Sequence, residues 1–493
     1  MNKLTYLGKK GYTIFKKDLN KEEENKIIND LIVKPFIPKS IIPASKFPIY
    51  RESSKKYYLP RFYGIEKFGN PKKIEIDRGD NIKLNFKGNL RDYQINIVKK
   101  YVDNVGEMGG GLLEIDTGLG KTVIALNILT KLNVKTLIIV HKEFLMNQWI
   151  ERIEEFIPTA KVGKIQGSKK DIEGKEIVIG MLQSLSMKDY DYELFNSFGL
   201  TIIDEVHHMG AEVFSQALYK VVTKYMLGLS ATIDRKDGLT SVFKMFIGDI
   251  IHTEKRKQEN NNVIVRRIDY KIDDEEFNEI KYNFRGDVCY SSMINKLCLY
   301  NRRSEFIIKL LKALFNENNN QQILILGHNK NLLKYLYDSI EHNNIESVGY
   351  YLGGMKQNDL KISEDKKIII ATYSMASEGL DIKSLTTLLM VTPKSDVVQC
   401  VGRILRSKHE NPMVIDIVDQ HDIFKRQYYK RKKFYSEQKY LIENTSNIKL
   451  EENNFKFKNI VNNNDDKDDD KDDDKDVQSV FKGNCIIDLT EDD

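Results

Sequence analysis

The sequence predicts an α/β protein with two parallel-sheet domains in tandem, a small α+β accessory domain before them and a disordered acidic tail after them. From Leu112 onward, short apolar runs alternate with amphipathic stretches, which is the pattern of strand–helix–strand units in a parallel sheet. The polar stretch 253–262 interrupts this alternation, and a second alternation follows. We expect the accessory domain at 1–85, the parallel-sheet domains at 86–252 and 301–445, a linker at 253–300 and the tail at 446–493.

Length and composition exclude several other classes of protein. A chain of 493 residues is longer than one hydrophobic core usually organises, and 41% apolar residues suffice to fill two or three. No run of 18 apolar residues occurs, so the sequence predicts neither a signal peptide nor a membrane span. The four cysteines lie far apart and form neither a disulfide framework nor a zinc pattern: Cys289, Cys298, Cys400 and Cys485. We therefore expect a soluble, intracellular protein.

Charge is unevenly distributed along the chain. The formal net charge is +5, but residues 465–493 carry −9, which leaves +14 for residues 1–464, of which +9 lies in residues 1–85. A basic folded part predicts a polyanionic partner if the charges share a face, and the alternative is a solvated lysine-rich surface.

Two basic stretches contain interleaved aromatic residues. The first includes Arg51, Lys55, Lys56, Tyr57, Tyr58, Arg61 and Tyr63, and the second spans 423–440, with Phe424, Tyr428, Tyr429, Phe434, Tyr435 and Tyr440. Cations that neutralise phosphates and rings that stack on bases would together bind single-stranded nucleic acid. The alternative is that the rings pack in the core while the cations stay in solvent.

The expected elements follow in chain order. Residues 1–85 do not follow the alternation and contain six of the nine prolines, so they are assigned to a separate α+β domain. The first parallel sheet is expected to use strands at 112–115, 136–140, 176–180, 200–204 and 225–230, with helices at 122–132 and 143–156. Trp149, on the second of these helices, is expected to be buried. The second sheet is expected to use strands at 322–327, 367–372, 385–392 and 413–418, with helices at 304–315, 331–340 and 397–406.

The stretch EIDTGLGKTVIAL, 114–126, raises the question of a nucleotide-binding loop. An apolar strand, a glycine loop and a helix are the context that such a loop requires, because backbone N–H groups and the helix N-terminus together hold the phosphates. The strict pattern is not met, since Ile115 stands at the position of the first glycine. Taken alone, the stretch could also be a simple turn.

A pair of carboxylates supports the nucleotide-binding reading. The run LTIIDEVHH, 200–208, delivers Asp204 and Glu205 to the carboxyl end of an apolar strand. Asp204 could hold Mg²⁺ together with the Thr122 hydroxyl, and Glu205 could polarise the water that attacks the γ-phosphate. An adjacent Asp–Glu pair is also common at a solvated strand end. With His207 completing D-E-x-H, the sequence here resembles the superfamily 2 helicases and translocases.

The resemblance extends in the correct order over residues 88–436, and it implies two RecA-like domains with MgATP between them. It implies nucleotide contacts from LRDYQ, DTGLGKT and SEGLDI, namely Arg91, Gln94 (which would recognise adenine), Thr117, Gly118, Leu119, Gly120, Lys121, Thr122, Gly379 and Asp381. It implies metal binding by Thr122 and Asp204. It implies nucleic-acid contacts from GMLQSL and IIIATYS, namely Gln183, Ser184 and Thr372. It implies that hydrolysis is coupled to strand movement by His207, Ser230, Ala231 and Thr232, with Ile233 where proline is common.

The last motif, QCVGRILR, indicates how the second domain would take part in hydrolysis. It supplies Gln399, Arg403 and Arg406, which join Lys121, Asp204 and Glu205 as the expected catalytic set. Hydrolysis needs positive charge on the developing γ-phosphoryl group, and an arginine from a second domain provides it only when the two domains close. Closure and catalysis would therefore be coupled.

The texture between motifs is similar to the UvsW and XPB-type branch, and especially to the poxvirus transcript-release helicase and its homologues in large DNA viruses. This implies a nucleic-acid-stimulated ATPase, an ATP-dependent helicase or translocase that acts in viral transcription, repair or recombination, with DNA favoured over RNA as its track and RNA left open. RNA polymerase or other transcription factors would be its partners, and the host cytoplasm, viral factory or virion its location. Two alternatives remain open: a motor that remodels a polymerase or a protein–DNA complex without strand separation, and a non-motor, ATP-gated binding module.

The tail contains two further features. NNNDDKDDDKDDDKD is low-complexity and acidic, has nothing to bury, and could compete with DNA for a basic groove. The terminal CIIDLTEDD resembles a SUMO-interacting segment, which would add a strand to a partner's sheet. An acidic segment that only opposes aggregation is the alternative.

Overall fold

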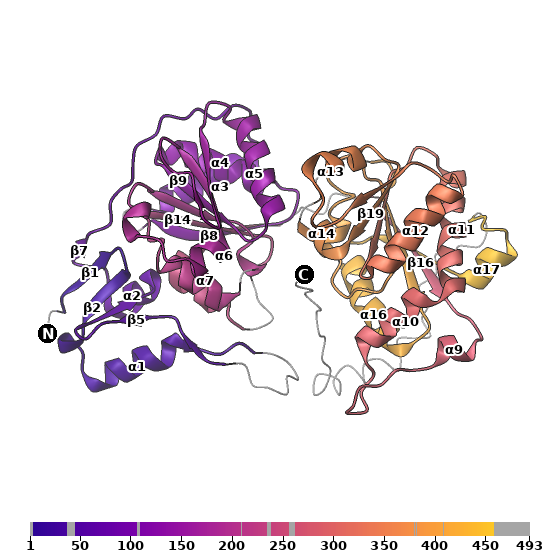
Figure 1. Ribbon diagram of the computed structural model, residues 1–493, viewed down its shortest axis with the longest axis horizontal. Coiled ribbons are helices and arrows are strands. Elements are labelled where there is room, and N and C mark those ends of the chain that lie inside the picture. Colours follow the sequence, from indigo (N-terminus) through magenta and orange to yellow (C-terminus); the bar gives the residue numbers. More distant parts are fainter. Residues whose placement is uncertain are drawn as a thin grey trace. The chain divides into compact units, whose positions relative to one another are not determined.

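The computed structural model describes residues 3–36, 45–105, 109–208, 210–233, 238–255, 262–378, 380, 382–407 and 409–457. The chain divides into two compact units, Met1–Arg256 and Lys257–Asp493, each of which is built on a parallel sheet (Figure 1). The predicted fold class, two tandem RecA-like α/β domains with α+β structure at the N-terminus, is confirmed. The expected acidic run and the SUMO-like segment lie outside the described residues.

The N-terminal segment forms a five-stranded sheet of order β5-β6-β2-β1-β7. Its strands are β1 (Thr5–Gly8), β2 (Gly11–Phe15), β5 (Arg51–Glu52), β6 (Lys56–Leu59) and β7 (Lys73–Ile74), and the short pair β3 (Ile32–Val33) and β4 (Phe47–Pro48) lies apart. The helices are α1 (Lys21–Leu31) and α2 (Arg61–Phe68), with a 3₁₀ turn η1 (Lys16–Asp18). Helix α1 begins with a capping box between Asn20 and Glu23, which satisfies backbone N–H groups that the helix leaves unpaired.

This segment shares a hydrophobic core with the parallel-sheet domain that follows it. Tyr12, Ile14 and Leu59 from the N-terminal sheet belong to the same buried cluster as Phe214 and Phe243 from the next domain. The boundary expected at residue 85 is therefore not a packing boundary, because both sides bury their apolar faces against each other.

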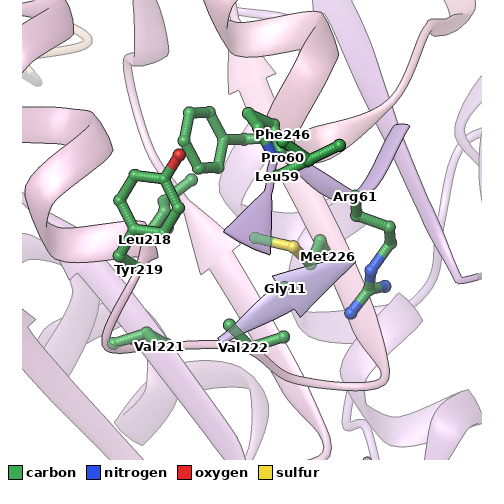
Figure 2. Close-up of a pocket in the computed structure, with 10 residues that line it drawn as sticks. All are labelled: Gly11, Leu59, Pro60, Arg61, Leu218, Tyr219, Val221, Val222, Met226 and Phe246. Carbon is green, nitrogen blue, oxygen red and sulfur yellow. The ribbon is translucent and has the colours of Figure 1, made fainter. Parts of the chain in front are cut away.

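Arg61 ties the two parts together by hydrogen bonds. The residue is only 3% exposed, and its guanidinium donates to the backbone carbonyls of Thr223 and Lys224. Leu59, Pro60 and Arg61 line a cavity of about 20 Å³ together with Tyr219, Met226 and other residues of the first parallel-sheet domain (Figure 2). That volume holds about one water molecule, so this junction is a packed seam and not a ligand pocket.

The first parallel sheet has the order β11-β10-β12-β9-β13-β14-β8-β15 and is parallel except at the β10–β11 edge. Its strands are β8 (Gly110–Ile115), β9 (Thr136–Val140), β10 (Val162–Gln166), β11 (Lys169–Lys170), β12 (Ile177–Met181), β13 (Leu200–Ile203), β14 (Tyr225–Ser230) and β15 (Ile250–Glu254). Helices α3 (Asp92–Asn104), α4 (Lys121–Leu132) and α5 (Glu143–Phe156) pack in one core cluster. Helices α6 (Leu182–Met187), α7 (Ala211–Leu218) and α8 (Thr240–Ile247) pack in another, with 3₁₀ turns η2 (Tyr192–Phe195) and η3 (Val206–His208).

The second unit is a seven-stranded, fully parallel sheet of order β18-β19-β17-β20-β21-β16-β22. Its strands are β16 (Ile264–Tyr270), β17 (Ile323–Gly327), β18 (Val348–Tyr351), β19 (Ile368–Thr372), β20 (Thr387–Met390), β21 (Met413–Asp419) and β22 (Leu441–Ser446). Its helices are α9 (Glu275–Asn278), α10 (Tyr290–Leu299), α11 (Asn301–Glu317), α12 (Lys330–His342), α13 (Gln357–Glu364), α14 (Tyr373–Glu378), α15 (Val398–Val401), α16 (Asp422–Glu437) and α17 (Asn447–Glu452).

Two expected boundaries need correction. The segment 253–300 is more than a linker, because it contains the end of β15 of the first sheet and the whole of β16 of the second. Strand β16 pairs with β21 on one side and with β22 on the other. The expected tail begins too early, because β22 runs to Ser446 and α17 buries Leu450 in the core of the second unit. Within the described ranges, no helix has the length and apolar character needed to cross a membrane.

Candidate functional site

The glycine loop lies between β8 and α4, at the carboxyl edge of the first parallel sheet. Gly118 and Gly120 both have left-handed backbone conformations, with φ of +85° and +84°. The conformation at Gly120 favours glycine, and a Cβ atom there would lie 2.5 Å from Nε2 of Gln94 and would have to displace that side chain. With Thr117 and Leu119 in the loop and Lys121 and Thr122 opening α4, backbone N–H groups gather at a helix N-terminus, which is a fit for phosphate.

Gln94 fastens this loop to the start of α3. It is 5% exposed, and its Nε2 donates to the Leu119 carbonyl at 3.0 Å while its Oε1 accepts from the Arg91 backbone N–H at 3.0 Å. The Tyr93 hydroxyl also donates to the Leu119 carbonyl at 3.0 Å. The structure thus brings Gln94 and Tyr93 into contact with the loop, with Arg91 beside them at the start of α3, and the nucleotide contacts of Arg91 and Gln94 stay a prediction.

The two carboxylates lie at the end of β13, which pairs with β9 and β14 in the centre of the sheet. Oε1 of Glu205 lies 2.5 Å from Nζ of Lys121, so the lysine of the loop and the second carboxylate form an ion pair. Glu205 has a φ of +49°, an unusual conformation for a residue with a side chain that costs on the order of 1 kcal/mol. Strain of this kind is common where a side chain must be aimed at a site.

Asp204 is buried and held by two hydrogen bonds. It is 6% exposed, its Oδ2 accepts from the Trp149 indole Nε1–H at 2.8 Å, and its Oδ1 accepts from the Glu205 backbone N–H at 3.0 Å. Burial raises the pKa of Asp204 to about 6, with a further rise from the Glu205 charge and an opposing effect of Lys121. A buried carboxylate that is reluctant to ionise fits a site that receives a cation.

A chain of contacts leads from Glu205 to the end of β14. The His207 Nδ1 atom lies 3.4 Å from Oε2 of Glu205 and 2.7 Å from the Ser230 hydroxyl oxygen. The Ser230 hydroxyl donates in turn to the Thr232 carbonyl, and Ala231 is buried between them in the chain. Of the expected coupling residues, His207 therefore contacts the expected catalytic carboxylate directly, and Ser230 and Thr232 are linked to it through His207.

The residues expected to contact nucleic acid are bonded within their own domains. The exposed Gln183, on α6, donates from Nε2 to the His141 carbonyl at 3.1 Å. The Ser184 hydroxyl accepts from the Gly167 backbone N–H at 2.8 Å. In the second unit, Thr372 is the last residue of β19, and its hydroxyl oxygen lies 3.2 Å from the Ser374 hydroxyl oxygen.

The arginine motif of the second unit contains two different environments. Arg403 is buried, and its Nε and a terminal nitrogen donate to the carbonyls of Ala376 and Leu380 at 2.6 and 2.9 Å. Arg406 and Gln399, by contrast, are partly exposed. Gly379 and Asp381 lie outside the described residues.

The aromatic residues of the two basic stretches mostly support the packing alternative. Tyr57 and Tyr63 are buried in the N-terminal segment, and Arg51 stacks over the Tyr219 ring at 4.7 Å. On α16, three rings are in the core: Phe424, Tyr428 and Tyr435.

Arg431, also expected to face nucleic acid, is buried as well. Its guanidinium makes two 2.8 Å hydrogen bonds to the Asp416 carboxylate, which also accepts from the Tyr435 hydroxyl at 3.1 Å. The exposed face of α16 keeps basic side chains such as Arg426 and Lys433. Base stacking by the buried rings is therefore excluded, while phosphate contacts by the exposed cations are not.

Each of the two units matches a family of known proteins. The family model described as "Type III restriction enzyme, res subunit" matches residues 87–235, and "Helicase conserved C-terminal domain" matches residues 304–408. "Putative ATP-dependent RNA helicase L396" of Acanthamoeba polyphaga mimivirus is 40% identical over 411 residues, which are 80% of this chain and 78% of that protein. "Putative helicase 161L" of Invertebrate iridescent virus 6 is 28% identical over 383 residues, 74% of this chain and 84% of that protein.

Solved structures give more distant matches. T4 UvsW has 18% identity and a TM-score of 0.36, covering 91% of this chain and 100% of that one. The Pyrococcus furiosus Hef helicase domain has 15% identity and a TM-score of 0.44, covering 69% and 98%. The family assignment rests on the sequence matches, in which both helicase domain models occur in order. The chain belongs to the superfamily 2 helicases, in the group represented by the helicases of large DNA viruses.

Proposed function

We propose that the chain is a nucleic-acid-stimulated ATPase that uses MgATP hydrolysis to move along DNA and separate its strands. The observation that carries this proposal is the meeting of Lys121, Glu205 and Asp204 at the carboxyl edge of the first sheet, beside a glycine loop that opens a helix. In a parallel α/β sheet this edge is where ligands bind. Two acids beside a phosphate-binding loop can provide the metal ligand and the proton acceptor that phosphoryl transfer to water needs.

Each residue has a separate task in this proposal. ATP and Mg²⁺ would supply the phosphoanhydride to be cleaved and the charge neutralisation of its phosphates. The Lys121 ammonium, which pairs with Glu205 in the structure, would turn to the phosphates and leave the Glu205 carboxylate to accept a proton from water. Thr122 and Asp204 would hold the metal ion.

The second unit would complete the site. We assign transition-state charge stabilisation to Arg406, because it is partly exposed, whereas Arg403 is buried and bonded to the Ala376 and Leu380 carbonyls. Arg403 would then hold the backbone that leads to Gly379 and Asp381, which we propose as further nucleotide contacts.

We propose DNA as the track, with transcript release in viral transcription, or repair and recombination, as the process. The mimivirus relative is named as an RNA helicase, so the proposal must be tested against RNA directly. His207 and Ser230 would transmit the state of Glu205 to the strand, because they connect it to the end of β14.

The deciding experiment is steady-state ATPase activity with no nucleic acid, single-stranded DNA, duplex DNA and single-stranded RNA. We expect strong stimulation by DNA that is abolished in Glu205→Gln, since the amide cannot accept the proton from water. Displacement of a labelled oligonucleotide, measured in parallel, separates a strand-separating motor from a remodeller that hydrolyses ATP without displacing a strand. Stimulation by RNA alone would overturn the assignment of the track, and absence of any hydrolysis would overturn the function.

A further inference from the structure

The one tryptophan of the chain occupies a position that packing alone does not explain. Trp149 lies on α5 with Leu145, Met146 and Ile153, which form the face that this helix buries against the sheet. It is 1% exposed. An apolar face of this kind is served as well by phenylalanine or leucine, whereas a buried indole N–H needs a hydrogen-bond acceptor.

The acceptor of that N–H is the carboxylate expected to bind metal. Nε1 of Trp149 donates to Oδ2 of Asp204 at 2.8 Å across 55 residues of sequence. The other oxygen, Oδ1, accepts from the Glu205 backbone N–H at 3.0 Å. Each carboxylate oxygen is therefore fixed by one donor and keeps further lone-pair capacity for a ligand.

We propose that Trp149 is a positioning residue for Asp204, whose indole N–H holds the carboxylate in the orientation in which it binds the metal ion of the nucleotide complex. This inference rests on the proposed function. Without the N–H, Oδ2 loses its donor, and the carboxylate is held only through Oδ1 by the Glu205 backbone N–H. Outer groups that orient a metal ligand commonly change metal affinity by about 10- to 100-fold when they are removed.

Substitution of the donor tests this role. In Trp149→Phe the aromatic packing is retained and the N–H is lost, so the Mg²⁺ concentration for half-maximal ATPase activity should rise about tenfold. Binding of a fluorescent ATP analogue in EDTA should stay unchanged, because it does not depend on the metal site. The matched control is Tyr101→Phe, which removes another buried donor of the same domain, the hydroxyl that bonds to the Met226 carbonyl at 2.7 Å. A half-saturating Mg²⁺ concentration within twofold of the control would overturn the proposal.

A second measurement needs no activity, because the protein contains its own reporter. Excitation of indole moves electron density from its pyrrole ring to its benzo ring, so an anionic carboxylate at Nε1 shifts the emission to longer wavelength. Asp204→Asn, in metal-free buffer, should therefore shift the emission of Trp149 to shorter wavelength, while the exposed Asp103→Asn leaves it in place. MgADP added to the unsubstituted protein should shift the emission in the same direction, and it should not do so in Asp204→Asn.

These two measurements separate the proposals. An unshifted emission in Asp204→Asn would overturn the positioning contact, even in a protein that hydrolyses ATP. A clear shift in a protein without any ATPase activity would establish the contact and reject the proposed motor, together with the metal-positioning role that depends on it.

Discussion

Asp204→Asn should make the nucleotide-free protein more stable while abolishing its ATPase activity. The carboxylate has a pKa of about 6 in the folded protein, mainly because of burial, against an ordinary value of 3.8. A difference of about two units corresponds to a penalty of roughly 3 kcal/mol for keeping Asp204 ionised at neutral pH. Asparagine removes that penalty because it is neutral and nearly the same size.

The substitution also has a cost that can be read from the structure. Asp204 accepts hydrogen bonds at both oxygens, from Trp149 and from the Glu205 backbone. Asparagine offers one oxygen and one NH₂ group, so one of these donors faces another donor, at a cost of about 1 to 1.5 kcal/mol. The net gain is then roughly 1.5 to 2 kcal/mol, which for a unit of this size raises the melting temperature by about 3 to 8 °C.

The difference in stability between Asp204→Asn and the unsubstituted protein should depend on pH. The pKa of Asp204 is raised in the folded state, so protonation favours folding, and the penalty is complete only above pH 6. The stability advantage of Asp204→Asn should therefore be full at pH 8, shrink as the pH falls through 6, vanish at about pH 4.5 to 5, where the penalty has fallen to the cost of the lost hydrogen bond, and reverse near pH 4. Melting is followed by circular dichroism in EDTA without nucleotide, with Asp103→Asn as the control. A variant that melts at or below the unsubstituted protein at pH 8 would refute the reasoning.

Further outcomes follow from individual contacts. Arg431→Met leaves the buried Asp416 carboxylate without its guanidinium partner and should cost about 3 to 5 kcal/mol in chemical unfolding, while the exposed Arg426→Met should leave the midpoint unchanged. Arg406→Ala should lower kcat at saturating DNA by a factor on the order of 10³ with an unchanged melting temperature, and a fall below tenfold would contradict its assigned role. Ser230→Ala should retain most DNA-stimulated ATPase activity but displace strands more slowly, because the contact with His207 is lost, and equal losses of both activities would contradict a coupling role.

Hydrophobic periodicity predicted most of the two sheets but missed strands whose charges are paired far along the chain. The strand β16 contains Arg266, Arg267 and Asp269 in seven residues and therefore reads as polar. In the fold, Arg266 makes ion pairs with Glu317 of α11 and Glu443 of β22, both of which come later in the chain. A local pattern does not contain those partners, so the segment was assigned to a linker.

The parts of the candidate site that lie within short, continuous stretches of sequence could be predicted. The loop, the two acids and the Ser230 segment were named from their order, and the structure brings Lys121, Glu205, His207 and Ser230 into contact. The hydrogen bond of Trp149 to the acid pair was not predicted, because the spacing of apolar residues on α5 shows that a ring is buried but not what its N–H meets.

The buried guanidinium of Arg61 also restricts how the protein can be divided. Its acceptors, the carbonyls of Thr223 and Lys224, come just before the central strand β14, and the surrounding core is contributed from both sides of residue 85. A shortened version that begins at the first nucleotide-binding motif would present this apolar seam to water, with two carbonyls that have lost their cationic donor. Such a shortened protein would self-associate through its exposed apolar surface even without nucleotide. The N-terminal segment is therefore part of the hydrophobic core of the first unit and not a separable attachment.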